Sequence, residues 1–89
     1  MKEKIILFMK QRIGHDVQFS DDDNIFELGL ANSLFALQLV LFLENSFGIK
    51  VGNEDLDIAN FSSINRLHEF ASRKVKQIET ERHPASVAR

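Results

Sequence analysis

The sequence predicts an all-α protein, a small antiparallel four-helix bundle with three long helices and one short helix. Three observations support this fold class. Apolar residues recur at helical spacing in three long stretches, no segment is a convincing strand, and 89 residues imply one domain. Amphipathic helices of this kind bury their apolar faces against one another. We expect the domain to span residues 1–80 and residues 81–89 to form a frayed tail.

The first long helix is expected over residues 2–13. Its apolar positions recur at helical spacing: Ile5, Ile6, Met9 and Ile13. Gly14 follows directly and is a typical stop for a helix.

Residues 15–32 form a long, polar and turn-rich connection. Its scattered apolar side chains include Val17, Phe19, Ile25, Phe26 and Leu28. Long ordered loops are uncommon unless they have a role, so we expect these side chains to hold the loop against the core. We also expect a helical turn near residues 24–27 and a backbone conformation at Gly29 that other residues resist.

The second long helix is expected over residues 33–47, which contain neither proline nor glycine. Ser33 is expected to be its N-cap, because a serine hydroxyl can accept a hydrogen bond from a free amide of the first turn. Gly48 is expected to end the helix.

The last third of the chain predicts the short helix and the third long one. The short helix is expected within residues 53–57, and the long one follows Ser62 or Ser63 as its cap. The apolar stripe of the last helix comprises Ile64, Leu67, Ala71, Val75 and Ile78.

The second long helix is more apolar than a bundle helix needs to be, because Gln38 is its only polar residue between Leu34 and Leu43. The side chains that can face the other helices are Leu37, Val40, Leu41 and either Leu43 or Phe47. The side chains expected to point at least partly away are Leu34, Phe35, Gln38 and Phe42. Either this apolar surface is exposed and binds a partner, or the loop over residues 15–32 covers it.

Composition limits the classes of function. A hydrophobic content of 44% and a charged content of 27% suit a folded soluble domain, and the absence of cysteine excludes disulfides and thiol chemistry by the chain itself. The apolar run near the N-terminus is too short for a signal peptide or a membrane span, so we expect a cytoplasmic protein. Residues 1–15, 16–60 and 61–89 carry net charges of +3, −8 and +3. The acidic centre disfavours nucleic acid and predicts basic protein partners.

No catalytic or metal site is expected from the residue pattern. A serine nucleophile needs a nearby base and an oxyanion site. The three histidines, His15, His68 and His83, lie in a loop, a helix and a tail without a triad signature. An EF-hand loop beginning at Asp21 would require glycine where Phe26 stands and glutamate where Asn32 stands.

The segment IFELGLANSLFALQLVLFLENSFGIKV resembles the acyl carrier proteins of fatty-acid, polyketide and nonribosomal peptide synthesis. Their serine motif corresponds to the start of the second helix, and Glu44 and the sequence Phe47-Gly48-Ile49 match its far end. The later segment NFSSINRLHEF is similar to the approach to the family's last helix. The resemblance implies a non-catalytic carrier. It also implies that a phosphopantetheinyl transferase attaches 4′-phosphopantetheine from coenzyme A to Ser33, and that the thiol of this arm carries an acyl group.

Two departures from the family pattern affect the expected partners. Asn32 stands where an aspartate usually precedes the serine, with one extra residue after Gly29, and Phe35 and Gln38 occupy positions that are often acidic in the family. Docking is therefore expected to depend more on apolar contact than on ion pairs. The expected partner-binding residues are Asn32, Leu34, Phe35, Gln38 and Leu41.

The stretch NSLFALQLV is similar to discrete carriers of hydroxymalonyl, methoxymalonyl or aminomalonyl extender units of polyketide or hybrid polyketide and nonribosomal peptide synthesis. This likeness implies an acyl-loading enzyme, dehydrogenases and an acyltransferase or synthase as partners of a monomeric carrier. Two alternatives stay open: an aminoacyl or peptidyl carrier, and a helical adaptor without a prosthetic group that binds partners through the second helix.

Overall fold

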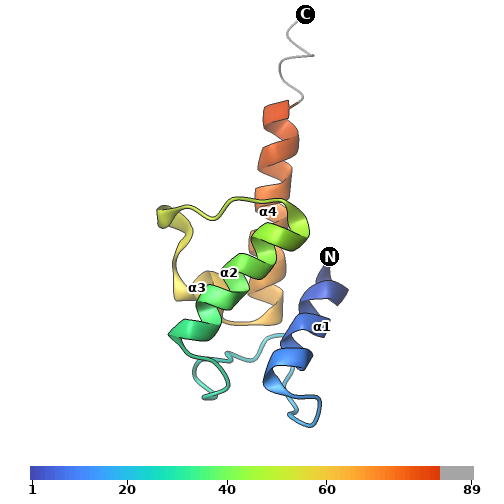
Figure 1. The fold of residues 1–89 in the computed structure, drawn as a ribbon, viewed down its shortest axis with the longest axis vertical. Coiled ribbons are helices and arrows are strands. Elements are labelled where there is room, and N and C mark those ends of the chain that lie inside the picture. The colour runs from blue at the N-terminus through green and yellow to red at the C-terminus, as the bar shows by residue number, and fades with distance from the viewer. Residues whose placement is uncertain (83–89) are drawn as a thin grey trace, which may run out of the picture.

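The fold was determined as a computed structural model, which describes residues 1–82 and the side chains of residues 1–79. Within these residues the protein is all-helical, and the predicted bundle of three long helices and one short helix is confirmed (Figure 1). The elements are α1 (Lys2–Ile13), α2 (Ser33–Phe47), the 3₁₀ turn η1 (Asn53–Asp55), α3 (Ile58–Phe61) and α4 (Ile64–Arg82). In the described part of the chain, no helix is both long and apolar enough to cross a membrane.

Helix α1 runs in the opposite direction to α2 and α4, and α3 lies below the loop that leaves α2 (Figure 1). The buried core draws on every α-helix and on both long connections. Its members are Ile5, Met9, Ile25, Leu39, Leu43, Ile49, Phe61, Ile64, Leu67, Phe70 and Ala71. Helix α1 packs closely on α4, whereas it meets α2 mainly through long aromatic side chains.

These aromatic contacts decide which side of α2 faces inward. The Phe8 ring of α1 stacks on Phe42 with centroids 4.2 Å apart and lies 6.2 Å from the Phe35 ring. The prediction that Phe35 and Phe42 point away from the other helices is therefore wrong. Because α1 covers that side, Leu37 and Leu41, which were expected to face the helices, are instead exposed.

The connection over residues 15–32 is held against the core, as predicted, but the expectation that Leu28 takes part is wrong, because Leu28 is 54% exposed. Ile25 is fully buried, and its backbone N–H donates to the carbonyl of Ser62 at 2.8 Å. A single helical turn follows, in which the Leu28 N–H donates to the Asn24 carbonyl at 3.0 Å. Gly29 has φ 77°, the left-handed region that glycine enters without a steric penalty.

The cap of α4 is confirmed, because the Ser63 Oγ accepts a hydrogen bond from the Arg66 N–H at 3.1 Å. The segment expected to form the short helix forms only η1, and the short α-helix lies further on, at Ile58–Phe61. Helix α4 continues to Arg82, beyond the expected domain end at residue 80. The remaining part of the predicted frayed tail, residues 83–89, lies outside the described residues.

Candidate functional site

The start of α2 is capped by Asn32 rather than by Ser33, so the predicted N-cap is wrong by one residue. Asn32 has an extended backbone, and its side-chain Oδ1 accepts a hydrogen bond from the Phe35 N–H at 3.0 Å. Asparagine caps a helix at least as well as serine, and here it occupies the earlier position. Ser33 thus becomes the first residue of the helix, and its hydroxyl is left without a capping role.

Ser33 is exposed at this helix end. The first backbone N–H groups of an α-helix lack intrahelical partners, and the helix dipole places partial positive charge there. This environment favours an anionic group such as a phosphodiester on the neighbouring side chain. An accessible hydroxyl at the positive end of a helix is therefore suited to carry a phosphate ester.

An apolar groove of about 220 Å³ opens beside Ser33, between α2 and α3. Its lining residues are Ser33, Ala36, Leu37, Val40, Leu56, Asp57, Ile58 and Phe61. The far wall exposes Leu56 and Ile58, each more than half accessible to solvent. The sequence analysis did not predict this wall. Its only sequence signal is that the apolar residues Leu56 and Ile58 lie next to acidic residues.

Three exposed leucines form a ridge along α2, which we call the leucine ridge. It consists of Leu34, Leu37 and Leu41, which are 65%, 56% and 51% exposed. The structure therefore answers the question left open by the sequence: apolar surface on α2 is exposed, and the loop over residues 15–32 does not cover it.

The predicted partner-binding residues are only partly brought together on this surface. Asn32, Leu34 and Leu41 are exposed, and Gln38 is half-buried between the ridge and α1. Phe35 is half-buried, and its ring packs toward Phe8 rather than beside the exposed leucines. Leu37 belongs to the exposed surface but was not among the predicted residues.

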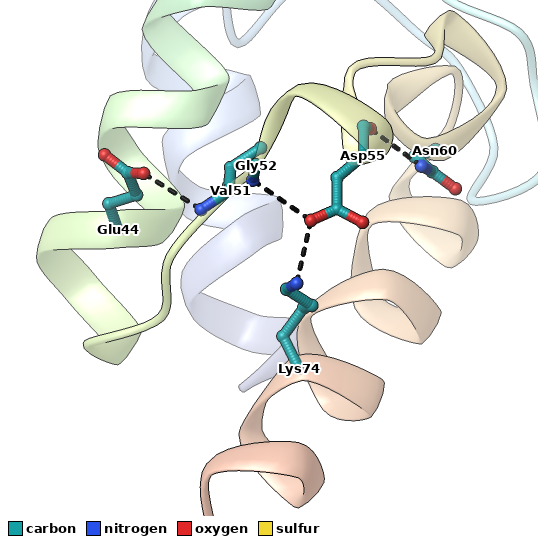
Figure 2. A network of polar contacts seen from close by, with 6 residues as sticks. All are labelled: Glu44, Val51, Gly52, Asp55, Asn60 and Lys74. Carbon is teal, nitrogen blue, oxygen red and sulfur yellow. Dashed lines mark hydrogen bonds and ion pairs between the residues drawn. The ribbon is translucent and has the colours of Figure 1, made fainter.

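The loop after α2, residues 48–57, is fixed by a network of polar contacts (Figure 2). At its start, the Glu44 Oε2 accepts a hydrogen bond from the Val51 N–H at 3.0 Å. Further along, the Asp55 Oδ2 accepts from the Gly52 N–H at 3.1 Å and pairs with Lys74 Nζ of α4 at 2.7 Å. This network ties the loop that carries Leu56 to the last helix.

The Lys74–Asp55 ion pair is largely shielded from water, with side chains only 16% and 15% exposed. The hydrogen bond from Lys74 lowers the pKa of Asp55 below its ordinary value of 3.8. The backbone carbonyl of Asp55 also accepts a hydrogen bond from Asn60 Nδ2 at 2.9 Å, which connects the same residue to α3 (Figure 2).

The acidic run after residue 20 makes structural contacts, two of them with the distant helices α1 and α4. Asp21 pairs with Lys2 at 2.9 Å, Asp22 accepts a hydrogen bond from Asn65, and Asp23 accepts one from the Ser20 N–H at 2.8 Å. Among the residues that the structure describes, no group of three or more acidic, histidine or cysteine side chains could hold a metal ion.

Comparison with known proteins agrees with this geometry. A family described as "Phosphopantetheine attachment site" matches residues 3–70, which include the start of α2 and the groove beside it. The chain belongs to this phosphopantetheine-attachment family. Proteins of the family are non-catalytic carriers, so this carrier is not an enzyme, and its cofactor is covalently attached 4′-phosphopantetheine.

Several curated relatives of the carrier are D-alanyl carrier proteins. The one from Leuconostoc mesenteroides is 30% identical over 75% of this chain and 86% of its own length. The one from Streptococcus uberis is also 30% identical, over 78% of this chain and 87% of its own length. A third, from Lactobacillus helveticus, is 28% identical over 90% of this chain and 96% of its own length.

The residues at the start of α2 fit the family's cofactor. Ser33 is an exposed residue, Asn32 performs the capping, and the helix end favours an anion. Carrier proteins work in general with a phosphopantetheinyl transferase and with enzymes that use the arm. The first turn of α2 contains no acidic residue, so any docking at this position must depend on other contacts.

Proposed function

We propose that Ser33 is the residue that carries 4′-phosphopantetheine, and that the protein tethers an acyl group for other enzymes. The observation that carries this proposal is the exposed residue Ser33 at the first position of α2, next to an apolar groove. When attached, the arm supplies a terminal thiol that holds the acyl group as a thioester. The helix end favours the phosphodiester, and the groove offers apolar surface beside it.

The Ser33 hydroxyl needs no activating base from this chain. The phosphopantetheinyl transferase would supply the base, together with a divalent metal ion. The chain's own contribution is to present the hydroxyl on a rigid helix end, which Asn32 maintains through its hydrogen bond to the Phe35 N–H.

Mass spectrometry of the intact protein tests the attachment site. The apo protein is incubated with coenzyme A, Mg²⁺ and a broad-specificity transferase. We expect the wild type to gain the mass of one phosphopantetheine group, Ser33→Ala to gain none, and the control Ser46→Ala in the same helix to behave as the wild type. A Ser33→Ala protein that is still modified, or a wild type that several transferases leave unmodified, contradicts the proposal.

The first candidate cargo is an unusual malonyl-type extender unit for polyketide or hybrid polyketide and nonribosomal peptide synthesis. Its support is the similarity of the stretch NSLFALQLV to carriers of such units. In that case a loading enzyme charges the arm, dehydrogenases oxidise the tethered unit, and an acyltransferase delivers it to a synthase. We propose that the carrier acts as a cytoplasmic monomer.

The second candidate cargo is an amino acid, because the curated relatives compared above are named D-alanyl carrier proteins. The mass of the loaded protein, isolated intact from its native producer, distinguishes the two cargoes. A mass increment equal to an aminoacyl group supports the second candidate, and a malonyl-type increment supports the first. Family membership favours either carrier over an adaptor without a prosthetic group.

A further inference from the structure

We propose that the face formed by α1 and α2 docks a protein partner whose apolar patch has carboxylates along one border. The carboxylates would lie against α1, and the apolar patch would cover the leucine ridge. This inference deepens the proposed function, on which it rests for the identity of the partner, an enzyme that loads or unloads the arm.

The exposed side of α2 is apolar and carries no charge that faces the partner. Glu44 is the only charged residue of the helix, and its carboxylate is engaged by the Val51 N–H at 3.0 Å, on the side of the loop that follows α2 (Figure 2). The leucine ridge is therefore a neutral apolar surface, so the charges that orient a partner must come from its borders.

One border of the ridge is a groove between α1 and α2 with a volume of about 380 Å³. We call it the aromatic groove, because Phe8 and Phe42 line it as a stacked pair. Its residues are Phe8, Arg12, Gln38, Leu41, Phe42, Asn45 and Ser46. Arg12 is the only charged residue among them, and its guanidinium lies 5.2 Å from the centre of the Phe8 ring.

A second cation lies at the other end of the same aromatic cluster, where Lys4 Nζ is 5.9 Å from the centre of the Phe47 ring. Within the described residues, Lys2 of α1 pairs with a carboxylate of another element, that of Asp21. Lys4 and Arg12 have no carboxylate partner among these residues. Contact with an aromatic face restricts each cation to the seam between α1 and α2. Both are thus placed to meet carboxylates of a partner.

The opposite border of the ridge has the opposite sign. Glu54 is exposed in the turn before α3, and Asp57, whose Oδ1 accepts a hydrogen bond from the Ala59 N–H at 3.0 Å, lines the apolar groove on the α3 side. A partner that covers the ridge can place charges opposite to those of both borders in only one orientation, with its acidic side against α1. The sequence prediction of basic protein partners, which was based on the acidic centre of the chain, stays a prediction.

Arginine suits this role because its planar guanidinium can bind a carboxylate through two parallel hydrogen bonds while it stacks on a ring. The expected contact joins the Arg12 guanidinium, held over Phe8, to an aspartate or glutamate of the partner. A partner with lysine or arginine at this position would face like charge and be rejected.

Two synthetic amphipathic helical peptides test the proposal with the apo protein. Both have the same leucine face, but one has glutamate and the other lysine along one flank. Fluorescence anisotropy at low salt should show that the acidic peptide binds about tenfold more tightly than the basic one. Binding of the acidic peptide should fall about tenfold in Arg12→Glu and by less in Arg12→Gln.

Arg73 provides a matched control, because it is an exposed arginine 5.5 Å from a phenylalanine ring, that of Phe70, on α4. Arg73→Glu changes the net charge by the same amount as Arg12→Glu and should leave the peptide preference unchanged. Circular dichroism of each variant verifies the helical fold.

Equal binding of both peptides, a preference for the basic peptide, or equal losses in Arg12→Glu and Arg73→Glu would overturn the proposal. None of these results changes the mass-spectrometric outcome at Ser33, since the peptides bind the unmodified protein. The two proposals can therefore fail separately.

Discussion

Replacing Lys74 with methionine is expected to destabilise the domain and to loosen the wall of the groove beside Ser33. Methionine keeps much of the apolar stem of lysine but removes the ammonium group that pairs with Asp55 at 2.7 Å. The Asp55 carboxylate then keeps its hydrogen bond from the Gly52 N–H but has no cation beside it, although it is largely shielded from water. The loop that precedes Leu56 is no longer fixed to α4.

The expected loss of unfolding free energy lies between two limits. Exposed ion pairs contribute at most about 1 kcal/mol, and breaking a fully buried pair costs about 3–5 kcal/mol. The two side chains here are 16% and 15% exposed, closer to buried than to exposed. Because Asp55 can still gain water when the loop moves, we expect a loss of about 2 kcal/mol, or a Tm lower by about 10 °C.

The pH dependence of this loss identifies its cause. The pairing with Lys74 lowers the pKa of Asp55 from 3.8, so its stabilisation is present above that value and disappears as the pH falls through the lower pKa of the folded protein. The difference between wild type and Lys74→Met should be constant from about pH 7 to about pH 5 and shrink at more acidic pH.

Urea unfolding followed by circular dichroism measures the free energies, and amide hydrogen exchange of Val51 and Gly52 reports on the loop. Lys76→Met is the matched control, since Lys76 is exposed on the same helix. Equal stability of Lys74→Met and Lys76→Met would show that the Lys74–Asp55 ion pair does not stabilise the fold. An effect of Lys74→Met that is independent of pH down to acid unfolding would show the same.

Three further predictions concern the ends and the aromatic contacts of α2. Asn32→Ala should lower the unfolding free energy by about 1 kcal/mol, because it removes the side chain that accepts a hydrogen bond from the Phe35 N–H. Asn32→Asp should keep the wild-type stability, and equal stability of the two variants in urea unfolding would exclude the capping role. Phe8→Ala should cost about 3 kcal/mol in the same assay, because it removes the ring stacked on Phe42, and a change below about 1 kcal/mol would contradict this packing. Gly48→Ala should cost about 1 kcal/mol, since residue 48 has φ 66°, and an unchanged Tm would show that the helix can end differently.

The helix limits that depend on local signals could be predicted from the sequence. Helical spacing and a following glycine predicted α1 at Lys2–Ile13. A stretch without proline or glycine, followed by Gly48, predicted α2 at Ser33–Phe47, and both helices are observed. The short α3 could not be placed, because four residues are too few to show a period. The cap of α2 was misassigned because Asn32 and Ser33 are adjacent residues of equal capping propensity.

The orientation of α2 could not be derived from its own sequence. A helix that is apolar on nearly every side has no preferred buried face until its neighbours are known. Phe8, far away in the chain, determines that Phe42 is covered and that Leu37 is exposed. Likewise, the resemblance to carrier proteins pointed to Ser33, but the groove wall at Leu56 depends on a long-range contact between the loop and α4.

The separation of the cap from the neighbouring serine has a consequence for the order of events in the life of the protein. Since Asn32 starts the helix, esterification of Ser33 would break no hydrogen bond that the fold requires. The chain can fold before the transferase binds it, and the transferase then modifies a folded domain. The unmodified protein would stay folded and could be modified later, when coenzyme A is present.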